Sequence, residues 1–398
     1  MTATRVLFVD HASRILGGAE INLLELLEAF PEAREKKIAC ACPLASPLGQ
    51  RLARLDLPVF DYRFANSLDQ FRLVGRRTAL RAGLAGWLAL RQARGRLEAV
   101  LAEFQPRAVV SCTNKDHFAA SAACQRRAVP SVWWVNDVLS AEFFPRVALL
   151  AFQRRARKGA TRLVTVSEFA RAALLRLGLP AHRTQTIHNG IPLKRYRRTE
   201  PGGLRDSLAL PPQEPLIGMI GRFAPWKGQD FFLQLAERWS RRQATGHFVL
   251  IGQAFNEDQE FEAGLRRVVR EKALAARVHF VPFQEAIGPA LSDLTVLVHA
   301  STRPEPFGRV VIEAMAVGTP VIAARAGGVL EIITDGQDGL LAEPGNLTAY
   351  AAQLERLLGS PQLANTLARA GRATVRRSFT IERVVQNFEE LLTAVTAR

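Results

Sequence analysis

The sequence lacks the motifs by which many proteins bind a nucleotide or a metal. It has no G-x-x-x-x-G-K-[ST] loop, no G-x-G-x-x-G after its first apolar run, and no D-x-D pair. These absences exclude a P-loop phosphate site and the usual dinucleotide-binding fingerprint. They also remove the aspartate pair that would hold a cation on a nucleotide diphosphate. A diphosphate bound here has to be stabilised by cationic side chains and backbone dipoles, without a metal.

Cysteine is scarce, and long apolar runs are missing. Cys40, Cys42, Cys112 and Cys124 form no metal-ligand grouping, so we expect buried thiols in a reducing compartment. The start, "MTATRVLFVD", lacks the long apolar region and cleavage site of a signal peptide. No stretch approaches the roughly 18 apolar residues of a spanning helix. We therefore expect a cytoplasmic protein.

The positive charge is concentrated in one half of the chain. Residues 1–200 hold 32 Lys and Arg against 16 Asp and Glu, whereas residues 201–398 hold 21 against 21. This asymmetry predicts that the first half meets something anionic. Nucleic acid, an acidic membrane surface and a phosphorylated acceptor are all candidates.

Short apolar runs alternate with amphipathic stretches along both halves of the chain, and 398 residues suffice for two domains. Helical periodicity marks residues 20–30, 76–104, 140–158 and 168–177. Alternation of this kind predicts an α/β fold with parallel sheets. The predicted strands are 6–9, 37–41, 108–112, 131–135, 162–166, 184–188, 215–221, 247–252, 277–282, 294–300, 320–324 and 339–343.

The segment between the two strand series is basic and then rich in Pro and Gly. We predict two doubly wound, Rossmann-like domains that face a cleft, at 1–190 and 214–380, joined by a linker at 191–213. The last residues, 381–398, are predicted to form a helix that packs back toward the N-terminal domain.

Three loops carry features that suit an anion. Gly17 and Gly18 follow the first strand, "GRFAPWKGQD" supplies Arg222 and Lys227 before a helix, and "PEPFGRVV" opens another helix at 308–310. In open α/β sheets ligands bind at the carboxyl ends of the strands, beside helix N-termini that attract phosphate. Together the loops predict a diphosphate site.

Two glutamates, Glu305 and Glu313, stand eight positions apart in "RPEPFGRVVIEAMAVGTP". Such a pair could be the acid and the nucleophile or base of a glycoside hydrolase. The hydrolase hypothesis does not explain the cationic loops. Glu313 lies in an apolar run, where a carboxylate needs a partner or a ligand.

Several motifs of the sequence resemble those of a known family. "GRFAPWKG" (221–228), "ASTRPEPFGRVVIEAMAVGTPVIAARAGG" (300–328) and "DGQDGLL" (335–341) are similar to the retaining glycosyltransferases of family 4, or group 1, with the GT-B fold. "GGAE", "VSEFARAAL" and "IHNGIP" extend the resemblance into the first half. It implies transfer of a hexose from a nucleotide sugar to an acceptor hydroxyl, without a metal, in bacterial polysaccharide, lipopolysaccharide or glycolipid synthesis.

The resemblance also implies roles for individual residues. Arg222 and Lys227 would bind the donor diphosphate and stabilise the leaving group, Glu305 would bind the donor sugar, and Glu313 the ribose. The nucleotide base would pack near Gly252. The remaining donor-side residues would contribute mainly backbone: Gly18, Gly221, Gly252, Phe307, Gly308, Arg309 and Val310.

The acceptor side departs from the family pattern. Many relatives have a histidine after the strand that corresponds to "VPSVWWV", whereas this chain has Asn136 followed by Asp137. Asparagine can bind a hydroxyl but cannot act as an acid or base. His117, which we expect in a loop at a strand end, is a further acceptor-side candidate. In the family scheme the leaving phosphate oxygen takes the acceptor proton, so the loss is tolerated.

Two other functions compete with this interpretation. A nucleotide-sugar epimerase on the same fold would share the diphosphate site, but would need no basic acceptor domain. A basic nucleic-acid-binding protein would show a recognition module, and the arginines here are scattered along helices.

The basic half suggests a membrane contact. An amphipathic stretch with Leu80, Leu84, Trp87 and Leu88 could rest on an anionic inner leaflet and present the cleft to a lipid-linked or anionic acceptor. The alternative is an ordinary surface helix. The arginines around this stretch are Arg72, Arg76, Arg77, Arg81, Arg91, Arg94 and Arg96.

Overall fold

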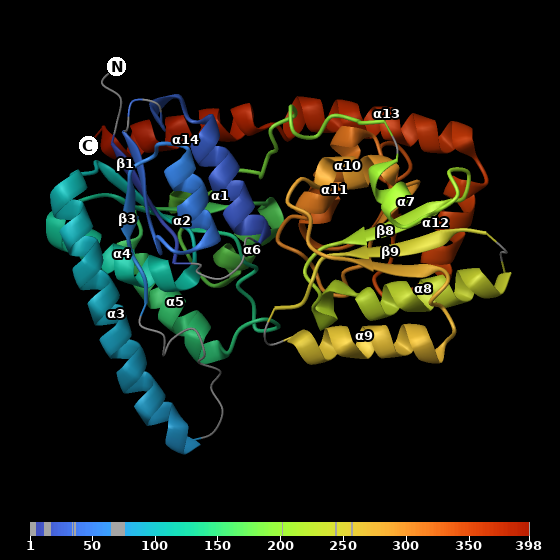
Figure 1. Ribbon diagram of the computed structural model, residues 1–398. Coiled ribbons are helices and arrows are strands. Elements are labelled where there is room, and N and C mark those ends of the chain that lie inside the picture. The colour runs from blue at the N-terminus through green and yellow to red at the C-terminus, as the bar shows by residue number, and fades with distance from the viewer. Residues whose placement is uncertain are drawn as a thin grey trace. The chain divides into compact units, whose positions relative to one another are not determined.

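The computed structural model divides the chain into two compact units (Figure 1). Unit 1 comprises Met1–His188 and Ile381–Arg398, and unit 2 comprises Asn189–Thr380. The structure describes residues 5–11, 17–33, 35, 37–64, 76–200, 202–242, 245–255 and 258–397, and of residues 76–85 and 87 only the backbone. Each unit is a parallel sheet with helices on its faces, so the predicted fold class is confirmed.

Unit 1 has a parallel sheet in the order β3-β2-β1-β4-β5-β6-β7. Its central strands are β-branched or apolar and buried on both faces, as parallel strands covered by helices must be. The short edge strand β3 was not predicted, because its three residues are half-buried or exposed and lack an apolar run. The strands are β1 Val6–Val9, β2 Ile38–Cys42, β3 Val59–Asp61, β4 Ala108–Ser111, β5 Ser131–Val135, β6 Arg162–Thr165 and β7 Thr184–Thr186.

The C-terminal helix α14 belongs to unit 1. Its Phe388 ring packs against Phe8 of β1 and Trp134 of β5, with ring centroids 6.4 Å and 5.0 Å away. No described helix of the chain is long and apolar enough to cross a membrane. The helices of unit 1 are α1 Gly18–Ala29, η1 Pro31–Ala33, α2 Pro47–Arg54, α3 Arg76–Phe104, α4 Asn114–Arg127, α5 Arg146–Gly159, α6 Glu168–Arg176, η2 Ala181–Arg183 and α14 Ile381–Thr396.

Unit 2 repeats the arrangement with a six-stranded parallel sheet, in the order β10-β9-β8-β11-β12-β13. Its strands are β8 Leu216–Ile220, β9 His247–Ile251, β10 Val278–Val281, β11 Val296–His299, β12 Val321–Ala324 and β13 Leu340–Ala342. Its helices are α7 Gly203–Ser207, η3 Pro225–Lys227, α8 Gln229–Arg242, α9 Gln259–Glu271, α10 Ile287–Asp293, α11 Arg309–Val317, η5 Gly327–Glu331, α12 Leu347–Leu358 and α13 Pro361–Ser378.

The segment predicted as a linker, 191–213, is part of unit 2. The buried carboxylate of Asp293, at the end of α10, accepts hydrogen bonds from the backbone N–H groups of Gly202, Leu204 and Arg205 at 2.7, 2.7 and 3.2 Å. These charge-assisted bonds fix the start of α7 to the body of the unit. The basic residues of 189–200 therefore belong with unit 2.

The strand orders place one switch point in each sheet. From the neighbouring strands β8 and β11 the chain proceeds in opposite directions across the sheet, to β9 on one side and to β12 on the other. In unit 1 the neighbouring strands β1 and β4 diverge in the same way. Loops diverge at such a point and leave a crevice at the carboxyl ends of the strands. The loops after β8, β11, β1 and β4 are therefore where ligands are expected.

Candidate functional site

Two loops of unit 2 meet at the switch point. The 3-10 turn η3 follows β8 and carries Lys227, and the next loop follows β11. The backbone N–H of Thr302 donates to the Trp226 carbonyl at 2.9 Å, which ties one loop to the other. The ammonium of Lys227 lies 4.4 Å from the centre of the Trp226 ring. The side chain of Lys227 is therefore held in place before any ligand arrives.

A single carboxylate oxygen joins these loops. Glu305 Oε1 lies 2.8 Å from Lys227 Nζ and 2.8 Å from His299 Nε2, and it also accepts a hydrogen bond from the Ser301 hydroxyl. Burial alone would raise the pKa of the Glu305 carboxyl. Lys227 and His299 outweigh that effect and hold the pKa well below its usual range.

Glu305 is consequently an ionised, fixed acceptor at neutral pH. Its side chain is 9% exposed, and none of the described residues donates to its second oxygen, Oε2. A carboxylate in this state can accept hydrogen bonds from a ligand but has no proton to give. It is suited to binding hydroxyl groups rather than to acid catalysis.

The second glutamate is paired within its own helix. Glu313 Oε1 accepts from Arg309 Nε at 2.7 Å and from the Tyr196 hydroxyl at 3.1 Å, and Arg309 Nη2 lies 3.1 Å from the same hydroxyl. The Arg309 side chain is only 10% exposed, so Arg309 is not a solvated surface residue. Glu313 thus has the buried partner that its apolar surroundings demand.

Arg222 is a cation of the site that has no charged partner among the described residues. Its guanidinium lies 4.8 Å from the centre of the Phe255 ring and forms no ion pair with a described residue. The loops after β8 and β9 approach closely, since Gly252 has φ +143° and a Cβ there would lie 2.1 Å from the Gly221 carbonyl oxygen. Only glycine fits such a position. This places Gly221 and Gly252 beside the Arg222 backbone.

Helix α11 begins without a capping side chain. Its N-cap is Gly308, with φ +105°, so the N–H groups of Arg309 and Val310 in the first turn can meet an anion. The Phe307 ring packs on Phe379, 5.7 Å between centroids, which leaves only its backbone for a ligand. Across the described part of the chain, no group of three or more His, Cys, Asp or Glu could hold a metal ion.

Unit 1 has its own polar cluster at the switch point. His11, after β1, places Nδ1 3.1 Å from Asp116 Oδ2 and 2.9 Å from the Thr113 hydroxyl. Tyr62 donates to the other oxygen of this buried carboxylate at 3.1 Å. Burial would lower the pKa of His11, but Asp116 holds that pKa above its ordinary value. The ring is 13% exposed, and no described residue bonds its Nε2.

The other candidates of unit 1 lie near this edge of the sheet. The Asn136 amide donates to the Cys112 carbonyl at 3.2 Å, and Asp137, an exposed residue, accepts a hydrogen bond from Asn114 at 2.8 Å. Gly18 is the exposed first residue of α1, and a Cβ added there would meet nothing within 4 Å. Packing therefore gives no reason for glycine at this position.

The prediction that His117 lies in a loop is wrong. It belongs to the first turns of α4, which Thr113 caps, and its side chain is fully buried. Its Nδ1 lies 2.7 Å from the Ser111 hydroxyl, and its ring stacks on Trp133 with 4.8 Å between centroids. Burial lowers the pKa of His117 to about 3, so the ring is neutral. It is a core residue with no surface for an acceptor.

Sequence reasoning missed His299, Tyr196, His11 and Asp116. For His299 there was a signal, a histidine at the end of the apolar run "LTVLVHA". His11 lies two residues after the first predicted strand, 6–9. Tyr196 left none, because its partner Glu313 is 117 positions away.

Both units match known protein families. The family described as "Glycosyltransferase Family 4" matches residues 16–195, and the family "Glycosyl transferases group 1" matches residues 203–374. A D-inositol 3-phosphate glycosyltransferase of Catenulispora acidiphila is 31% identical over 211 residues, 51% of this chain and 49% of that protein. The lipopolysaccharide core biosynthesis glycosyltransferase LpsE of Rhizobium meliloti is 29% identical over 188 residues, 47% and 52% of the two chains.

The chain thus spans about half the length of the curated relatives it matches. Among solved structures, HepE of Anabaena in complex with UDP-glucose superposes with a TM-score of 0.85 and 25% identity, covering 98% of this chain and 100% of HepE.

Proposed function

The chain belongs to the GT-B glycosyltransferases of the family 4 and group 1 kind, and we propose that it transfers a hexose from a nucleotide sugar to an acceptor hydroxyl, retaining the anomeric configuration and requiring no metal. One observation carries the proposal. The ionised carboxylate of Glu305 is fixed by Lys227 at the carboxyl end of the sheet, and the loop of Lys227 also carries Arg222, whose guanidinium forms no ion pair with a described residue.

The cations of unit 2 would bind the donor diphosphate. Arg222 and Lys227 carry positive charge on the loop after β8, and the uncapped first turn of α11 adds backbone N–H groups. As the bond to the sugar breaks, negative charge grows on the leaving diphosphate. Preorganised cations stabilise that charge more than they stabilise the ground state.

The two carboxylates would hold the two sugar rings of the donor. Glu305 Oε2 would accept a hydrogen bond from a hydroxyl of the transferred sugar, and Glu313 would accept from the ribose. Glu313 keeps its charge balanced by Arg309 at 2.7 Å, so ribose binding need not neutralise a buried carboxylate. On this assignment the backbone of residues 307–310 contacts the sugar and phosphates, and Gly252 borders the base.

The reaction needs no protein nucleophile. The bond between the anomeric carbon and the diphosphate oxygen breaks, and the acceptor oxygen bonds to the same face of that carbon. The proton of the acceptor hydroxyl passes to the departing phosphate oxygen. Glu305 is held 2.8 Å from Lys227 as a binding group, which favours this scheme over a covalent intermediate on Glu305.

The relatives suggest the substrates. Because HepE is solved with UDP-glucose, we propose a UDP-hexose as the donor. Because relatives act on inositol phosphate or build lipopolysaccharide core, we propose a polyol or saccharide acceptor that is anionic or lipid-linked. The pathway would be bacterial polysaccharide, lipopolysaccharide or glycolipid synthesis.

Unit 1 would bind that acceptor. With Nδ1 fixed by Asp116, the Nε2 of His11, which no described residue bonds, can hydrogen-bond an acceptor hydroxyl. Asn136 and Asp137 remain proposed contacts near the same edge of the sheet, whereas His117 is not proposed because it is buried. Gly18 remains a proposed donor contact.

A membrane contact through unit 1 is part of the proposal. Unit 1 holds 30 Lys and Arg against 18 Asp and Glu. Helix α5 exposes Val147 by 70% and Leu150 by 48%, next to Arg146 and Arg154, a combination that suits an anionic bilayer surface. Of the stretch predicted from sequence, Arg72 and the side chains of 76–85 and 87 lie outside the described residues. Equal binding to acidic and neutral vesicles at low salt would refute this contact.

A panel of nucleotide sugars tests the function. Purified protein is assayed for thermal stabilisation and for release of the nucleotide, with and without candidate acceptors. We expect one nucleotide sugar to raise the melting temperature by several degrees at saturation, since ligand binding to the folded state stabilises it. Stabilisation by none of the panel would contradict the proposal.

A further inference from the structure

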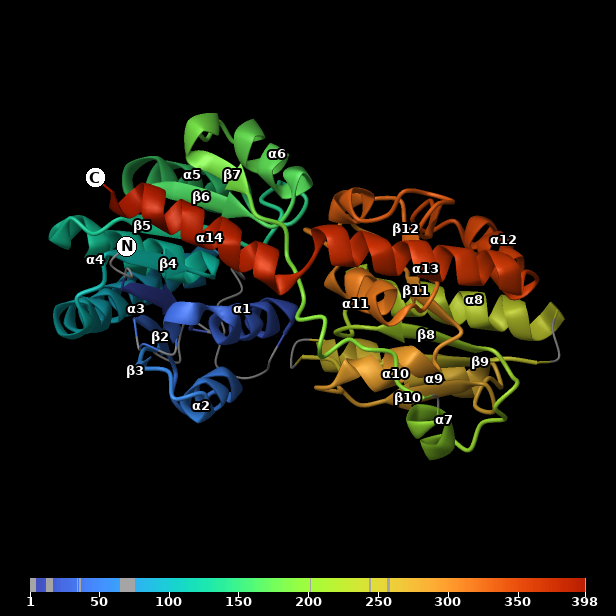
Figure 2. The same cartoon turned by 90° about the horizontal axis from the view of Figure 1, so that it is seen from above.

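Two separate segments bring arginines to one side of unit 2. Helix α13, whose course Figure 2 shows, carries four of them within nine residues. The segment before α7 adds Arg198. At 100° per residue the four lie within one broad face of the helix, and Arg369 and Arg376 are about 10 Å apart along its axis. The α13 arginine patch consists of Arg198, Arg369, Arg372, Arg376 and Arg377.

None of these five guanidinium groups forms an ion pair with a described residue. The hydrogen bonds they make are to uncharged groups, from Arg198 to the Gly318 carbonyl at 3.3 Å and from Arg377 to the Thr374 hydroxyl at 3.4 Å. The arginines of α8 and α9 differ, because most are paired with carboxylates on the same helix or a neighbouring one. The patch therefore carries positive charge that the fold does not neutralise.

The two segments meet at Gly318. Arg198 donates a hydrogen bond to the Gly318 carbonyl. The Arg372 side chain packs so closely on Gly318 that a Cβ added to this glycine would lie 2.6 Å from Arg372 Nε. Partial burial and the nearby guanidinium groups of Arg198 and Arg376 lower the pKa of Arg372. Like charges gathered in this way repel one another, and a bound anion would relieve the repulsion.

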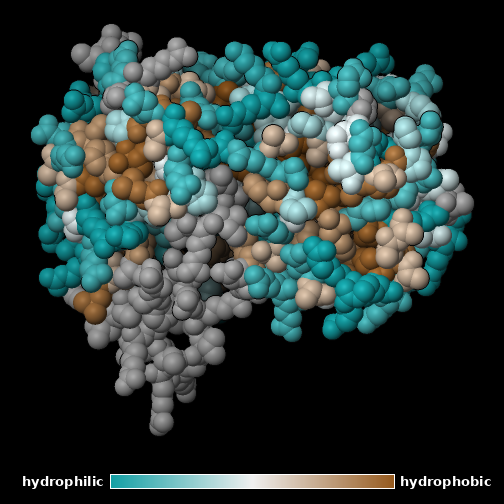
Figure 3. Space-filling view, viewed as in Figure 1, coloured by the Kyte–Doolittle hydropathy of each residue, from teal (hydrophilic) through white to brown (hydrophobic). Residues whose placement is uncertain are grey.

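The four arginines of α13 face one open region of the surface. Arg369, Arg372, Arg376 and Arg377, with Ala373, line an open space of about 600 Å³. Figure 3 shows hydrophilic residues along this edge of unit 2, over α13. Helix α13 has no large exposed hydrophobic residue to insert into a membrane. These features favour a discrete anion over a bilayer.

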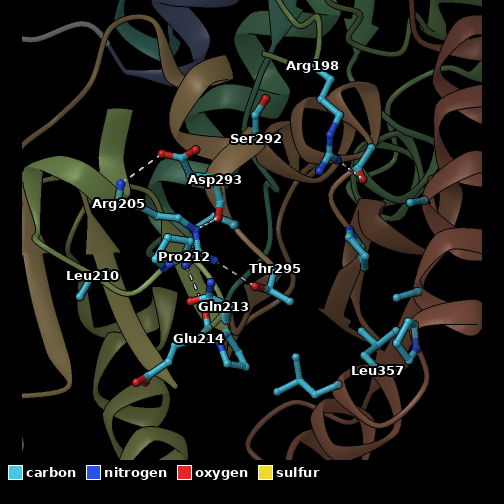
Figure 4. Close-up of a pocket in the computed structure, with 18 of the residues that line it drawn as sticks. Arg198, Arg205, Leu210, Pro212, Gln213, Glu214, Ser292, Asp293, Thr295 and Leu357 are labelled. Atoms are coloured by element: carbon cyan, nitrogen blue, oxygen red, sulfur yellow. Dashed lines mark hydrogen bonds between the residues drawn. The ribbon is translucent and has the colours of Figure 1, made fainter. Parts of the chain in front are cut away.

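A second cavity, of about 510 Å³, borders the patch through Arg198 (Figure 4). Pro215, Thr295 and Pro320 line it, so it lies at the amino ends of β8, β11 and β12. Its own buried charges, Arg205 and Asp293, are satisfied by internal hydrogen bonds, so this cavity alone indicates no ligand. Of the patch, this cavity involves Arg198 alone, whereas Arg222, Lys227 and Glu305 follow the carboxyl ends of the strands.

We propose that the α13 arginine patch binds a ligand that carries two or more neighbouring phosphate groups, at a site independent of the donor site. Each guanidinium offers a fork of donors that matches phosphate oxygens, and several arginines spread over about 10 Å can hold more than one phosphate. The site does not depend on the proposed sugar transfer.

Inorganic tripolyphosphate is a suitable probe. Its binding is measured by titration calorimetry on the whole protein, with UDP present at saturation to occupy the donor site. We expect Arg369→Ala/Arg376→Ala to bind at least tenfold more weakly than the wild type. Both side chains are exposed, so the fold should survive, whereas Arg372→Ala could disturb the packing on Gly318. The matched control is Arg267→Ala/Arg270→Ala on α9, which removes the same charge from the same unit.

Three results would overturn the proposal. The first is equal weakening by the control pair, which would indicate non-specific attraction. The second is tripolyphosphate binding that is seen only without UDP and is lost in Lys227→Met, which would place the ligand at the donor site. The third is patch-dependent binding to phosphatidylglycerol vesicles without binding of tripolyphosphate, which would make the patch a membrane contact. Retained binding in Lys227→Met would support an independent site.

Discussion

Replacing Lys227 with methionine removes a half-buried charge while keeping most of the side-chain volume. Lys227 is 22% exposed and lies 2.8 Å from Glu305, whose carboxylate is 9% exposed. Removing one partner of a fully buried pair costs about 3–5 kcal/mol, because the other charge is left without compensation. The partial exposure of Lys227 reduces this to about 2–3 kcal/mol. For a domain of this size, that corresponds to a fall of about 4–12 °C in Tm.

The same substitution should nearly abolish turnover. Loss of one preorganised donor to a developing anion lowers kcat by about 10²–10³. Turnover is measured as nucleotide release from the nucleotide sugar that stabilises the protein most. The double variant Lys227→Met/Glu305→Gln should recover most of the lost stability, since both charges are gone, but none of the lost turnover.

An exposed ion pair provides the control. Lys272, whose ammonium lies 3.3 Å from Glu237, is 50% exposed. Lys272→Met should cost less than about 1 kcal/mol, as surface pairs do. The reasoning would be refuted if Lys227→Met matched this control in Tm and kept its kcat within a factor of three. A double variant that regained turnover would refute the assigned role of Lys227.

Four further predictions follow from the site. Glu313→Ala should weaken nucleotide-sugar binding about tenfold by calorimetry, because the ribose loses a charged acceptor; unchanged affinity would contradict the role. EDTA should leave turnover unaltered, and strict dependence on an added divalent cation would count against the mechanism. His11→Gln should slow transfer to the acceptor yet leave donor affinity unchanged, whereas equal loss of both would contradict its place in unit 1. The pKa of His117 is about 3 in the folded state, below its ordinary 6.5. The neutral ring therefore makes its full contribution to the unfolding free energy above pH 6.5, and this contribution falls as the pH drops. Between pH 6 and 5 the unfolding free energy should fall by about 1 kcal/mol through this group, a loss that His117→Phe should abolish in urea titrations.

The parallel strands were predictable from sequence because they are buried on both faces. Runs such as "VLFV" and "HFVLI" consist almost wholly of apolar residues, and β1 and β5 occupy the predicted residues. Helix α4 was missed because it starts directly after β4 with polar residues, "NKDHF", that resemble a loop. Its helical start depends on the Thr113 cap, whose hydroxyl accepts from the Asp116 N–H. That error also misplaced His117.

The donor-side residues could be named from sequence because they lie in local motifs. Arg222 and Lys227 share one loop, and Glu305 and Glu313 flank one helix start. Their electrostatic state could not be named, because it depends on contacts that form only in the folded chain. His299 reaches Glu305 only once β11 is formed, and Lys227 comes from 78 positions earlier. The same limit hid the contact between Tyr196 and Glu313.

The cations that pair with the two glutamates decide whether these residues bind a ligand or catalyse hydrolysis. A glycoside hydrolase needs one carboxyl group that is protonated near neutral pH, and burial in an apolar pocket is the usual way to raise its pKa. Both glutamates here are buried, but each has a cation within 2.8 Å of an oxygen, and the pKa of Glu305 is lowered rather than raised. Neither is therefore prepared to protonate a leaving group. Two buried carboxylates paired with nearby cations can still accept hydrogen bonds from hydroxyl groups, and a nucleotide sugar offers such groups on both of its rings.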